Sequence, residues 1–216
     1  MNYDVVIVAA GSGTRMGLGY NKVYYRPGGN TILEQTMSVF LADQECKHVV
    51  VVTEPELYRE EIHLEDDRIS VTSGGDTRQE SVEQGLALVQ EEYVLIHDGA
   101  RPFLSQECLA RIKDAMTTND AVCPVIPVKD TIKVIEDGYI RETLPRSILA
   151  AAQTPQAFRT ALLRKCMAQA SAEGYTGTDD CQLVEQYSSV KVYVTEGDYT
   201  NIKITTPEDL TSLYNK

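Results

Sequence analysis

Short runs of apolar residues alternate with longer amphipathic segments through the first two thirds of the chain. The runs at 5–8, 49–52 and 93–96 are almost entirely apolar, which is typical of strands covered on both faces. The segments between such runs carry apolar residues at helical spacing. Further strands are expected at 69–71 and 121–125, and helices at 32–41, 58–62, 80–89 and 106–116. The alternation predicts an α/β fold, a doubly wound and mostly parallel sheet that binds ligands at the carboxyl ends of its strands.

The pattern changes near residue 128, where helices no longer separate the strands. Stretches 131–135 and 139–144 flank Asp137-Gly138, and Asp-Gly between two strands is a strong hairpin signal. We expect this hairpin to project as an arm. A two-stranded ribbon alone is marginally stable in water, so the arm packs either on a second subunit or on its own domain. Beyond it the pattern predicts helices at 157–169, 179–186 and 207–214 and a strand at 190–194.

Composition narrows the class of protein. A chain of 216 residues suits one domain, here 1–216 with 128–146 as a dimerisation arm. The formal net charge of −12 argues against nucleic acid as a partner. We expect no membrane span and no signal peptide, since the chain has neither a long apolar run nor a basic leader. The five cysteines are dispersed without a C-x-x-C pair, which indicates reduced thiols and a cytoplasmic protein.

A loop of small residues, 9–17, follows the first expected strand. Backbone N–H groups exposed in such a loop bind phosphates, and Arg15 and Lys22 add positive charge beside them. The loop lacks the Gly-Lys-Ser/Thr ending of a Walker motif, and Met16 stands where the dinucleotide fingerprint has its third small residue. The loop therefore fits a nucleoside triphosphate that is attacked at phosphorus. The alternative is a tight turn with a solvated Arg15.

Three further segments supply polar groups at expected strand ends or beside them. Gly74-Gly75 allows a ligand close to the backbone, and Asp76 and Ser81 offer hydrogen bonds to a base or sugar, although a plain turn and helix cap would look the same.

Asp98 follows the strand at 93–96 and suits Mg²⁺ beside a phosphate, unless it only caps a helix. Arg101 fits another phosphate. His97 points to the opposite side of an extended chain and is expected to be structural. Lys203 lies in a strand-like stretch and is either an edge-strand solubiliser or a phosphate ligand.

An ordered set of motifs resembles the 2-C-methyl-D-erythritol 4-phosphate cytidylyltransferase family over roughly residues 3–212. The motifs lie at 9–17, 21–22, 74–81, 97–103, 127–133, 152–158, 177–180 and 196–210. The ribitol-5-phosphate cytidylyltransferases share the opening loop and the ending, and remain the alternative. Segments 127–133 and 142–146 are similar to the arm of the methylerythritol family and favour it. Two departures, Tyr20-Asn21 before Lys22 and Gly99 in place of a frequent Ala, remove no charged group.

The resemblance implies a nucleotidyltransferase fold, CTP and Mg²⁺ as co-substrate and metal, and a homodimer whose arms complete each other's sites. The positions matched to CTP binding are Ala9, Ala10, Gly11, Gly13, Gly75, Asp76, Ser81, Asp98 and Gly99, with Asp98 as the metal ligand. Those matched to or beside the sugar-phosphate pocket are Arg101, Thr131, Arg146, Thr154, Thr178, Lys203 and Thr205. The catalytic set is Arg15, Lys22, Arg146 and Lys203, and Thr131 and Arg146 would come from the partner chain.

A rival hypothesis from another class is a nucleotide-binding regulatory protein that keeps the fold without the reaction. Such a protein is expected to lose at least one charged group of the site. Arg15, Lys22, Asp98 and Lys203 are all present, which favours an enzyme.

Overall fold

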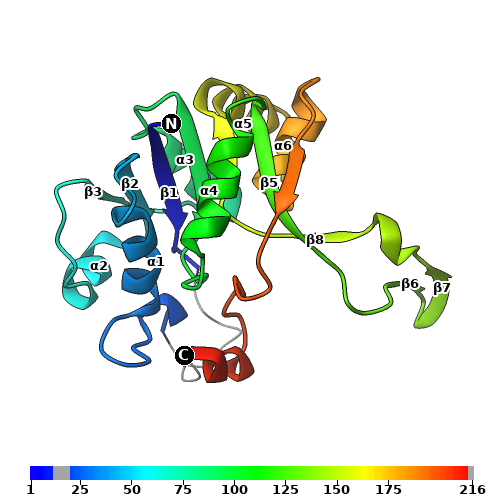
Figure 1. Cartoon of the computed structure of the whole chain (residues 1–216), viewed down its shortest axis with the longest axis horizontal. Coiled ribbons are helices and arrows are strands. Elements are labelled where there is room, and N and C mark those ends of the chain that lie inside the picture. Colours follow the sequence, from blue (N-terminus) through cyan, green and yellow to red (C-terminus); the bar gives the residue numbers. More distant parts are fainter. Residues whose placement is uncertain (12–19, 214–216) are drawn as a thin grey trace.

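A mixed sheet forms the centre of the protein, and helices cover both of its faces (Figure 1). The computed structural model describes residues 1–11 and 20–213. Four strands of the first half pair in parallel: β1 (Tyr3–Val8), β2 (Cys46–Val52), β3 (Ile69–Thr72) and β4 (Tyr93–Asp98). The helices that connect them are α1 (Ile32–Leu41), α2 (Pro55–Glu61) and α3 (Arg78–Leu86). The predicted α/β fold is confirmed.

The second half of the sheet departs from the parallel pattern. The strand order is β10-β5-β9-β4-β1-β2-β3, and the strands not yet given are β5 (Ala121–Pro127), β8 (Ala150–Ala152), β9 (Gln156–Arg159) and β10 (Tyr193–Glu196). β10 runs parallel to β5, whereas β9 runs antiparallel to both β4 and β5 and separates them. β8 pairs with the end of β5. The helix predicted to begin at residue 157 was wrong at its start, because β9 occupies that stretch and α5 (Thr160–Glu173) follows it.

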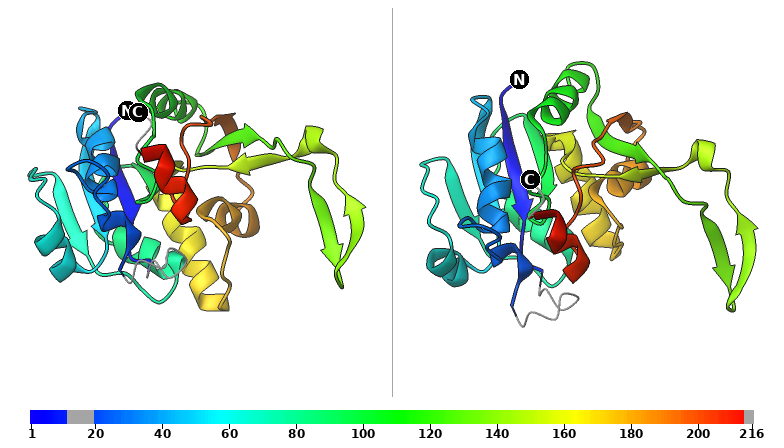
Figure 2. Two further views of the ribbon diagram at one scale, coloured as in Figure 1. Left: turned by 90° about the horizontal axis from the view of Figure 1, so that it is seen from below. Right: turned by 60° about the horizontal axis from the view of Figure 1, so that its bottom comes forward.

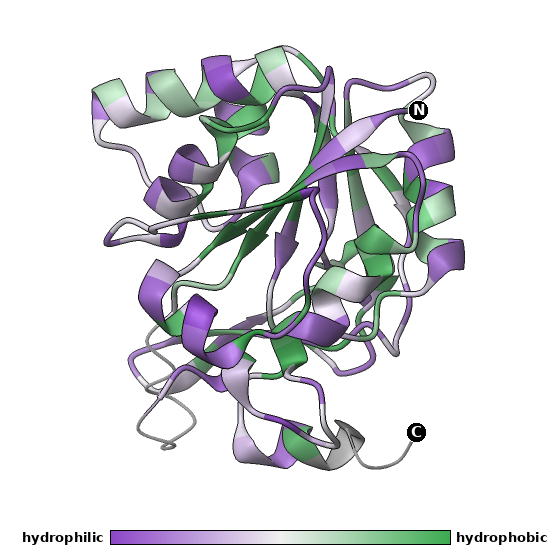
Figure 3. Cartoon of the chain, turned by 90° about the vertical axis from the view of Figure 1, so that its left-hand side faces the viewer, coloured by the Kyte–Doolittle hydropathy of each residue, from purple (hydrophilic) through white to green (hydrophobic). Residues whose placement is uncertain are grey.

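Alternate residues of each central strand serve two separate cores. Val5 and Ile7 of β1 pack with α1, α2 and α4 (Gln106–Ala115), whereas Val6 packs with α3, α5 and α6 (Asp180–Tyr187). Both faces of the sheet are therefore apolar, which explains the unbroken apolar runs of the sequence. Figure 3 shows mostly green central strands between helices that carry both purple and green residues. The layered core fixes the carboxyl ends of β1 and β4 side by side.

The predicted hairpin is present and projects from the body. β6 (Lys133–Glu136) and β7 (Tyr139–Thr143) form a two-stranded sheet of their own, and 3-10 helix η3 (Arg146–Ile148) follows. Asp137 and Gly138 both have positive φ, of 48° and 82°, as a two-residue hairpin turn requires. Figure 2 shows the arm extending away from the rest of the chain in both views.

Several other boundaries differ from the pattern-based expectation. The strand predicted at 190–194 is β10, which lies slightly later. The closing helix is the 3-10 helix η4 (Pro207–Leu213), and the strand-like stretch around Lys203 is not a strand. All five cysteines are free and buried. Within the described part of the chain, no helix has the length and apolar character that crossing a bilayer requires.

Candidate active site

Asp98 is the centre of a charged cluster at the carboxyl end of β4, where its register partner on β1 is Val8. Its Oδ2 atom lies 2.9 Å from Lys203 Nζ and 3.4 Å from Arg101 Nε. Its Oδ1 atom lies 3.5 Å from Arg78 Nε. Burial by itself would raise the pKa of the Asp98 carboxyl, but the charges of Lys203 and Arg78 outweigh burial and hold that pKa well below its usual range. The carboxylate is therefore ionised at neutral pH.

Lys203 reaches this cluster because the segment after β10 is bonded back to the end of β4. The Ile204 N–H donates to the Ala100 carbonyl (2.9 Å), and Arg101 Nη1 donates to the Asn201 carbonyl (2.7 Å). Ile204 is fully buried in a small cluster with Ile32. The edge-strand interpretation of Lys203 was wrong, since its ammonium pairs with Asp98 and its side chain keeps 37% exposure. A cation held by a carboxylate and still open to solvent is placed to receive an anion.

His97 and Thr154 lie beneath the cluster. The Asp98 N–H donates to Thr154 Oγ1 (3.1 Å), and the same hydroxyl lies 3.0 Å from His97 Nδ1. His97 Nε2 lies 3.2 Å from the Arg101 carbonyl. Because a carbonyl oxygen only accepts, Nε2 of the neutral ring carries the proton and donates to Arg101, and Nδ1 accepts from the Thr154 hydroxyl. His97 is fully buried, and burial lowers its pKa to about 4, so the ring is neutral at pH 7. A buried, neutral ring agrees with the structural role expected for this residue.

The opening loop begins at the carboxyl end of β1. The Ala9 N–H continues the sheet by donating to the Val52 carbonyl (2.8 Å), and Ala10 and Gly11 follow it toward solvent. Gly13 and Arg15, both predicted site residues, lie outside the described residues. Asn21 donates through Nδ2 to the Ala9 carbonyl (2.5 Å). This bond ties the start of the 3-10 helix η2 (Lys22–Tyr24), and so Lys22, to the end of β1.

The Gly-rich turn before α3 is packed against the opening loop. A Cβ atom on Gly74 would lie 2.5 Å from the Ala10 Cβ and 2.8 Å from Ser81 Oγ, so this position has room only for glycine. Ser81 is buried, accepts from the Gly75 N–H (3.2 Å) and donates to the Thr77 carbonyl (2.9 Å). Ser81 thus shapes the turn, while Gly75 and Asp76 are exposed. The Gly99 N–H donates to the Val8 carbonyl (2.9 Å) and so joins the end of β4 to the end of β1.

The remaining predicted residues fall into two groups. Thr205 and Thr178 are accessible and lie on loops beside the cluster's own elements: the Thr205 hydroxyl donates to the Lys203 carbonyl (3.1 Å), and Thr178 donates to Gln182 (3.1 Å). Thr131 and Arg146 belong to the arm, which carries them away from the body of their own chain (Figure 1). Arg146 Nη1 donates to the Lys129 carbonyl (2.7 Å) inside the arm.

Lys22 interacts electrostatically with Asp209, which lies near the end of the described chain. Burial would raise the pKa of Asp209 at the start of η4, but bonds from the Thr206 and Thr205 N–H groups lower it, and the charge of Lys22 lowers it further. Lys22 and Thr205 therefore border the same region, although the opening loop and the closing segment are far apart in the sequence.

Residues that the motif analysis did not single out for a role complete the cluster. Arg78 contacts both Asp98 and Asp180, and Asn201 Nδ2 donates to the Thr154 carbonyl (2.8 Å). Arg78 stands inside the motif at 74–81 and Asp180 inside the motif at 177–180, so position in a motif was the available signal. Their partnership depends on folding and leaves no local pattern.

A phosphate-sized anion at this edge would meet the cations Lys203 and Arg101, the accessible Ala10 and Gly11 at the start of the opening loop, and an ionised carboxylate. Among the described residues no three His, Cys, Asp or Glu side chains gather to hold a metal ion by themselves. Mg²⁺ commonly takes one or two carboxylates and completes its shell with substrate phosphates and water, so Asp98 with a triphosphate is an adequate ligand set. The fold and the site define a nucleotide-dependent transferase of the nucleotidyltransferase class.

Comparisons with known proteins give the family. The model of the family IspD, 2-C-methyl-D-erythritol 4-phosphate cytidylyltransferase, matches residues 3–214. A protein of that name from Geobacillus kaustophilus is 45% identical over 97% of this chain and 94% of its own length. The chain belongs to the 2-C-methyl-D-erythritol 4-phosphate cytidylyltransferase family, and the resemblance drawn from the motifs is confirmed.

Solved structures support the same assignment. The crystal structure of 4-diphosphocytidyl-2C-methyl-D-erythritol synthase from Anaerococcus prevotii superposes with a TM-score of 0.87 at 33% identity, covering 99% of this chain and 96% of that chain. The 2-C-methyl-D-erythritol 4-phosphate cytidylyltransferase of Thermus thermophilus gives 0.82 at 35% identity, covering 99% and 98%. The fold is therefore shared over nearly the whole chain.

Proposed function

We infer that this protein transfers the cytidylyl group of CTP to 2-C-methyl-D-erythritol 4-phosphate in isoprenoid biosynthesis, the reaction for which its family is named. An oxygen of the acceptor phosphate attacks the α-phosphorus of CTP in line, the new P–O bond forms, and pyrophosphate leaves with the electron pair of the broken bond. Both reactants are anions, so their repulsion opposes the approach. The observation that carries the inference is the set of cations around Asp98 at the strand ends.

Each cation suits a different part of this reaction. We propose that Lys203 and Arg101, which pair with Asp98, bind the acceptor phosphate, and that Lys22, the first residue of η2, binds the triphosphate. We propose that Lys203 and Lys22, with Arg15, stabilise the negative charge that builds up in the transition state. Ala9, Ala10, Gly11, Gly13, Gly75, Asp76, Ser81, Asp98 and Gly99 would form the CTP pocket, and Arg101, Thr154, Thr178 and Thr205 would form or support the acceptor pocket.

Asp98 would also hold a magnesium ion against the triphosphate. Its carboxylate is ionised, and its Oδ1 atom lies as far as 3.5 Å from Arg78 Nε, so this oxygen retains capacity for a further ligand. When bound, Mg²⁺ would neutralise part of the phosphate charge. Before the ion binds, the contacts of Lys203 and Arg101 with Oδ2 hold the carboxylate in its orientation.

The arm carries an apolar surface that favours a homodimer through residues 128–146. Ile135, Tyr139, Ile140 and Ile148 are 59%, 79%, 62% and 77% exposed, although a soluble surface usually keeps such side chains apart from one another. The arm also carries Thr131 and Arg146, which take no part in the charged cluster around Asp98 of the same chain. We propose that a second copy of the chain covers this surface and receives Thr131 and Arg146 in its acceptor pocket.

The five free cysteines suit a reducing compartment, and we propose the cytoplasm as the location.

The test of the proposed function must identify the acceptor substrate. Pyrophosphate release is measured with CTP and Mg²⁺ while 2-C-methyl-D-erythritol 4-phosphate and ribitol 5-phosphate are offered separately. The expected result is release with the methylerythritol phosphate alone. Release with ribitol phosphate alone would assign the protein to CDP-ribitol synthesis, and release with neither acceptor would leave a nucleotide-binding protein without transfer activity.

A further inference from the structure

Arg78 joins two carboxylates that come from different parts of the chain. It is the first residue of α3, and Thr77 and Glu80 form a capping box that fixes the start of this helix. Its Nε atom lies 3.5 Å from Asp98 Oδ1 at the end of β4. Its Nη2 atom lies 2.8 Å from Asp180 Oδ2 at the start of α6. One guanidinium therefore connects the central carboxylate of the site to the helix that follows Thr178.

Asp180 is a buried group that the reaction itself does not use. Its side chain is 1% exposed, and burial raises its pKa while the charge of Arg78 opposes that rise. An ionised carboxylate in such a place is costly without a partner, so Asp180 depends on Arg78. The backbone of Asp180 is also fixed, because its N–H and that of Cys181 both donate to Gln156 Oε1 (3.1 Å each). The carboxylate that Arg78 contacts is thus attached to a backbone held by two hydrogen bonds.

A second contact runs beside this ion pair. Gln79 Nε2 donates to the Tyr175 carbonyl (3.0 Å), and the Gly177 N–H donates to Gln79 Oε1 (3.0 Å). The start of α3 is thereby tied to segment 175–180, which carries Thr178. The Gly-rich turn with Gly75 and Asp76 leads directly into α3. The segment proposed to hold the nucleotide is consequently hydrogen-bonded to the segment proposed to hold the acceptor.

The two carboxylate oxygens of Asp98 contact different cations. Oδ2 is paired with Lys203 and Arg101, whereas Oδ1 faces Arg78. Opposed attractions set the rotation of the carboxylate, and the removal of Arg78 would leave both remaining cations on one side. Gln79 is neutral and its amide bonds to Tyr175 and Gly177 alone, whereas Arg78 contacts both Asp98 and Asp180 at the start of α6.

We propose that Arg78 and Asp180 are positioning residues for cytidylyl transfer: their ion pair fixes the rotation of Asp98 and the alignment of the acceptor segment with the nucleotide turn. The inference rests on the proposed function, because alignment matters only if two substrates react. In-line attack requires reacting atoms about 3–3.5 Å apart, and a misplacement of about 1 Å costs about 10²-fold in rate. Positioning of this kind lowers kcat more than it raises either KM.

The test compares kcat, both KM values and the melting temperature of Arg78→Lys, Asp180→Asn and the double variant. Lys keeps the charge of Arg78 but replaces the planar fork, whose Nε and Nη2 atoms face two different carboxylates, by a single nitrogen on a flexible stem. Asn keeps the shape of Asp180 without its charge. The matched control is Arg68→Lys, since Arg68 also forks between a carboxylate, Asp66, and backbone carbonyls, but lies on the loop before β3. Asp180→Asn keeps the test decisive if Arg78→Lys folds poorly.

We expect each single variant to lose about 10²-fold in kcat with both KM values changed less than about threefold. The double variant should be no slower than the worse single one, because the two residues act as a unit. Arg68→Lys should lower the melting temperature alone. Unchanged kcat in folded Arg78→Lys and Asp180→Asn, or a change confined to the KM for CTP, would overturn the inference while an active wild type upholds the function. A wild type that transfers nothing would overturn both.

Discussion

Lys203 Nζ lies 2.9 Å from Asp98 Oδ2, although the whole arm and three α-helices separate the two residues in the sequence. The pair forms because segment 198–204 is bonded to the loop after β4. Asp98 keeps a cation at the strand ends when no phosphate is bound, and phosphates compete for that cation when they arrive. In the proposed reaction, the cation that pairs with Asp98 in the resting site would also bind substrate phosphate.

Removal of the Lys203 charge should slow transfer without unfolding the protein. We expect Lys203→Met to lose about 10²-fold in kcat, the usual effect of deleting one preorganised charge. Pyrophosphate release under saturating substrates is the measurement. Lys165→Met is the control, because Lys165 is an exposed residue of α5. Equal rates for Lys203→Met and the control would show that Lys203 is only a partner of Asp98.

Gly74 should be intolerant of even one methyl group. A Cβ there would lie 2.5 Å from the Ala10 Cβ, and overpacking of this kind costs about 1–3 kcal/mol. We expect Gly74→Ala to push the turn away from the opening loop and to raise the KM for CTP about tenfold. Gly28→Ala is the control, since nothing lies within 4 Å of the added atom. A KM for CTP that stays at the wild-type value would contradict the packing of turn against loop.

Sites shared between subunits can be detected by mixing two inactive chains. In the proposed dimer, Arg146→Ala would inactivate only the site that its arm enters, and Lys22→Ala would inactivate only the site of its own chain. A heterodimer of the two should therefore contain one intact site, with about half of the wild-type activity, when isolated by two affinity tags. Sedimentation of the wild type as a dimer is the accompanying check. Inactive heterodimers of verified composition would exclude donation of Arg146 to the partner.

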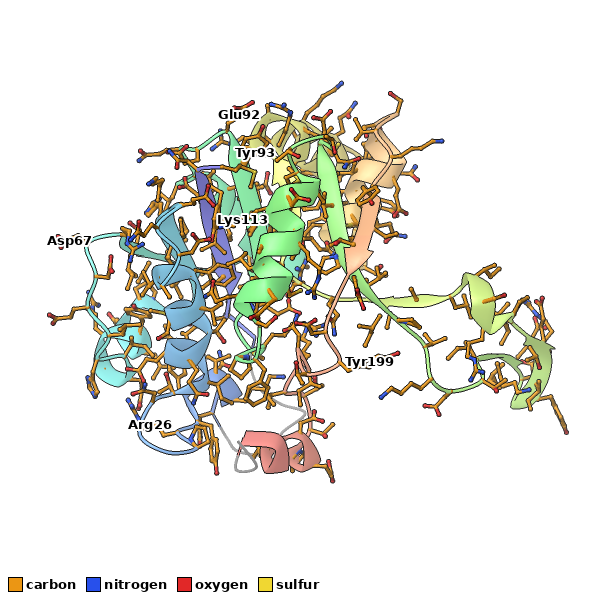
Figure 4. All side chains as sticks on the ribbon, viewed as in Figure 1. Arg26, Asp67, Glu92, Tyr93, Lys113 and Tyr199 are labelled. Atoms are coloured by element: carbon orange, nitrogen blue, oxygen red, sulfur yellow. The ribbon has the colours of Figure 1, made fainter. Side chains whose placement is uncertain are left out.

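Stability should depend on pH through Lys113 on α4 (Figure 4). Its Nζ atom lies 2.6 Å from both Asp43 Oδ2 and Glu45 Oε2. Burial would raise the pKa of Asp43, but its bonds with Lys113, the Glu45 N–H and Tyr3 lower it below its ordinary value. A lowered folded-state pKa means that Asp43 stabilises the fold above its unfolded pKa of about 3.9, and that this contribution is lost as the pH falls through the folded value.

We expect Lys113→Met to lower the free energy of unfolding by about 2 kcal/mol at pH 7 and by much less at a pH low enough to protonate Asp43 in the folded protein. Urea denaturation at the two pH values measures the difference. Lys191→Met, an exposed residue before β10, should change little at either pH. The same loss for Lys113→Met at both pH values would mean that packing of its stem, and not its charge, stabilises the fold.

The sequence pattern predicted most of the sheet because its strands are buried on both faces, and the helix predicted at 32–41 is α1. The pattern failed at β9, where Ala157 and Phe158 fit a strand and a helix equally well and the next residues are helical. It failed at Ile202-Lys203-Ile204, whose alternation is typical of a strand although the segment joins neither sheet of the described chain. Local periodicity does not report which partner a backbone finds.

The candidate site was predictable to the extent that its groups lie in motifs at strand ends. Asp98, Arg101 and Lys203 were predicted site residues and do meet. Arg78 lies in a motif but was given no role, because its significance comes from Asp180, which only the packing of α6 against the sheet brings near. Ion pairs between distant segments leave no periodic signal in a single sequence.

A crystal structure with CTP and Mg²⁺ would test the reaction centre most directly. We predict cytosine beside Ala10 and Gly75, the triphosphate along the opening loop near Lys22, and an Asp98 oxygen about 2.1 Å from the metal ion. Lys203 would then have turned from Asp98 toward the phosphates. A nucleotide bound elsewhere on the sheet, with Asp98 still paired to Lys203, would contradict the assignment of this edge as the place of cytidylyl transfer.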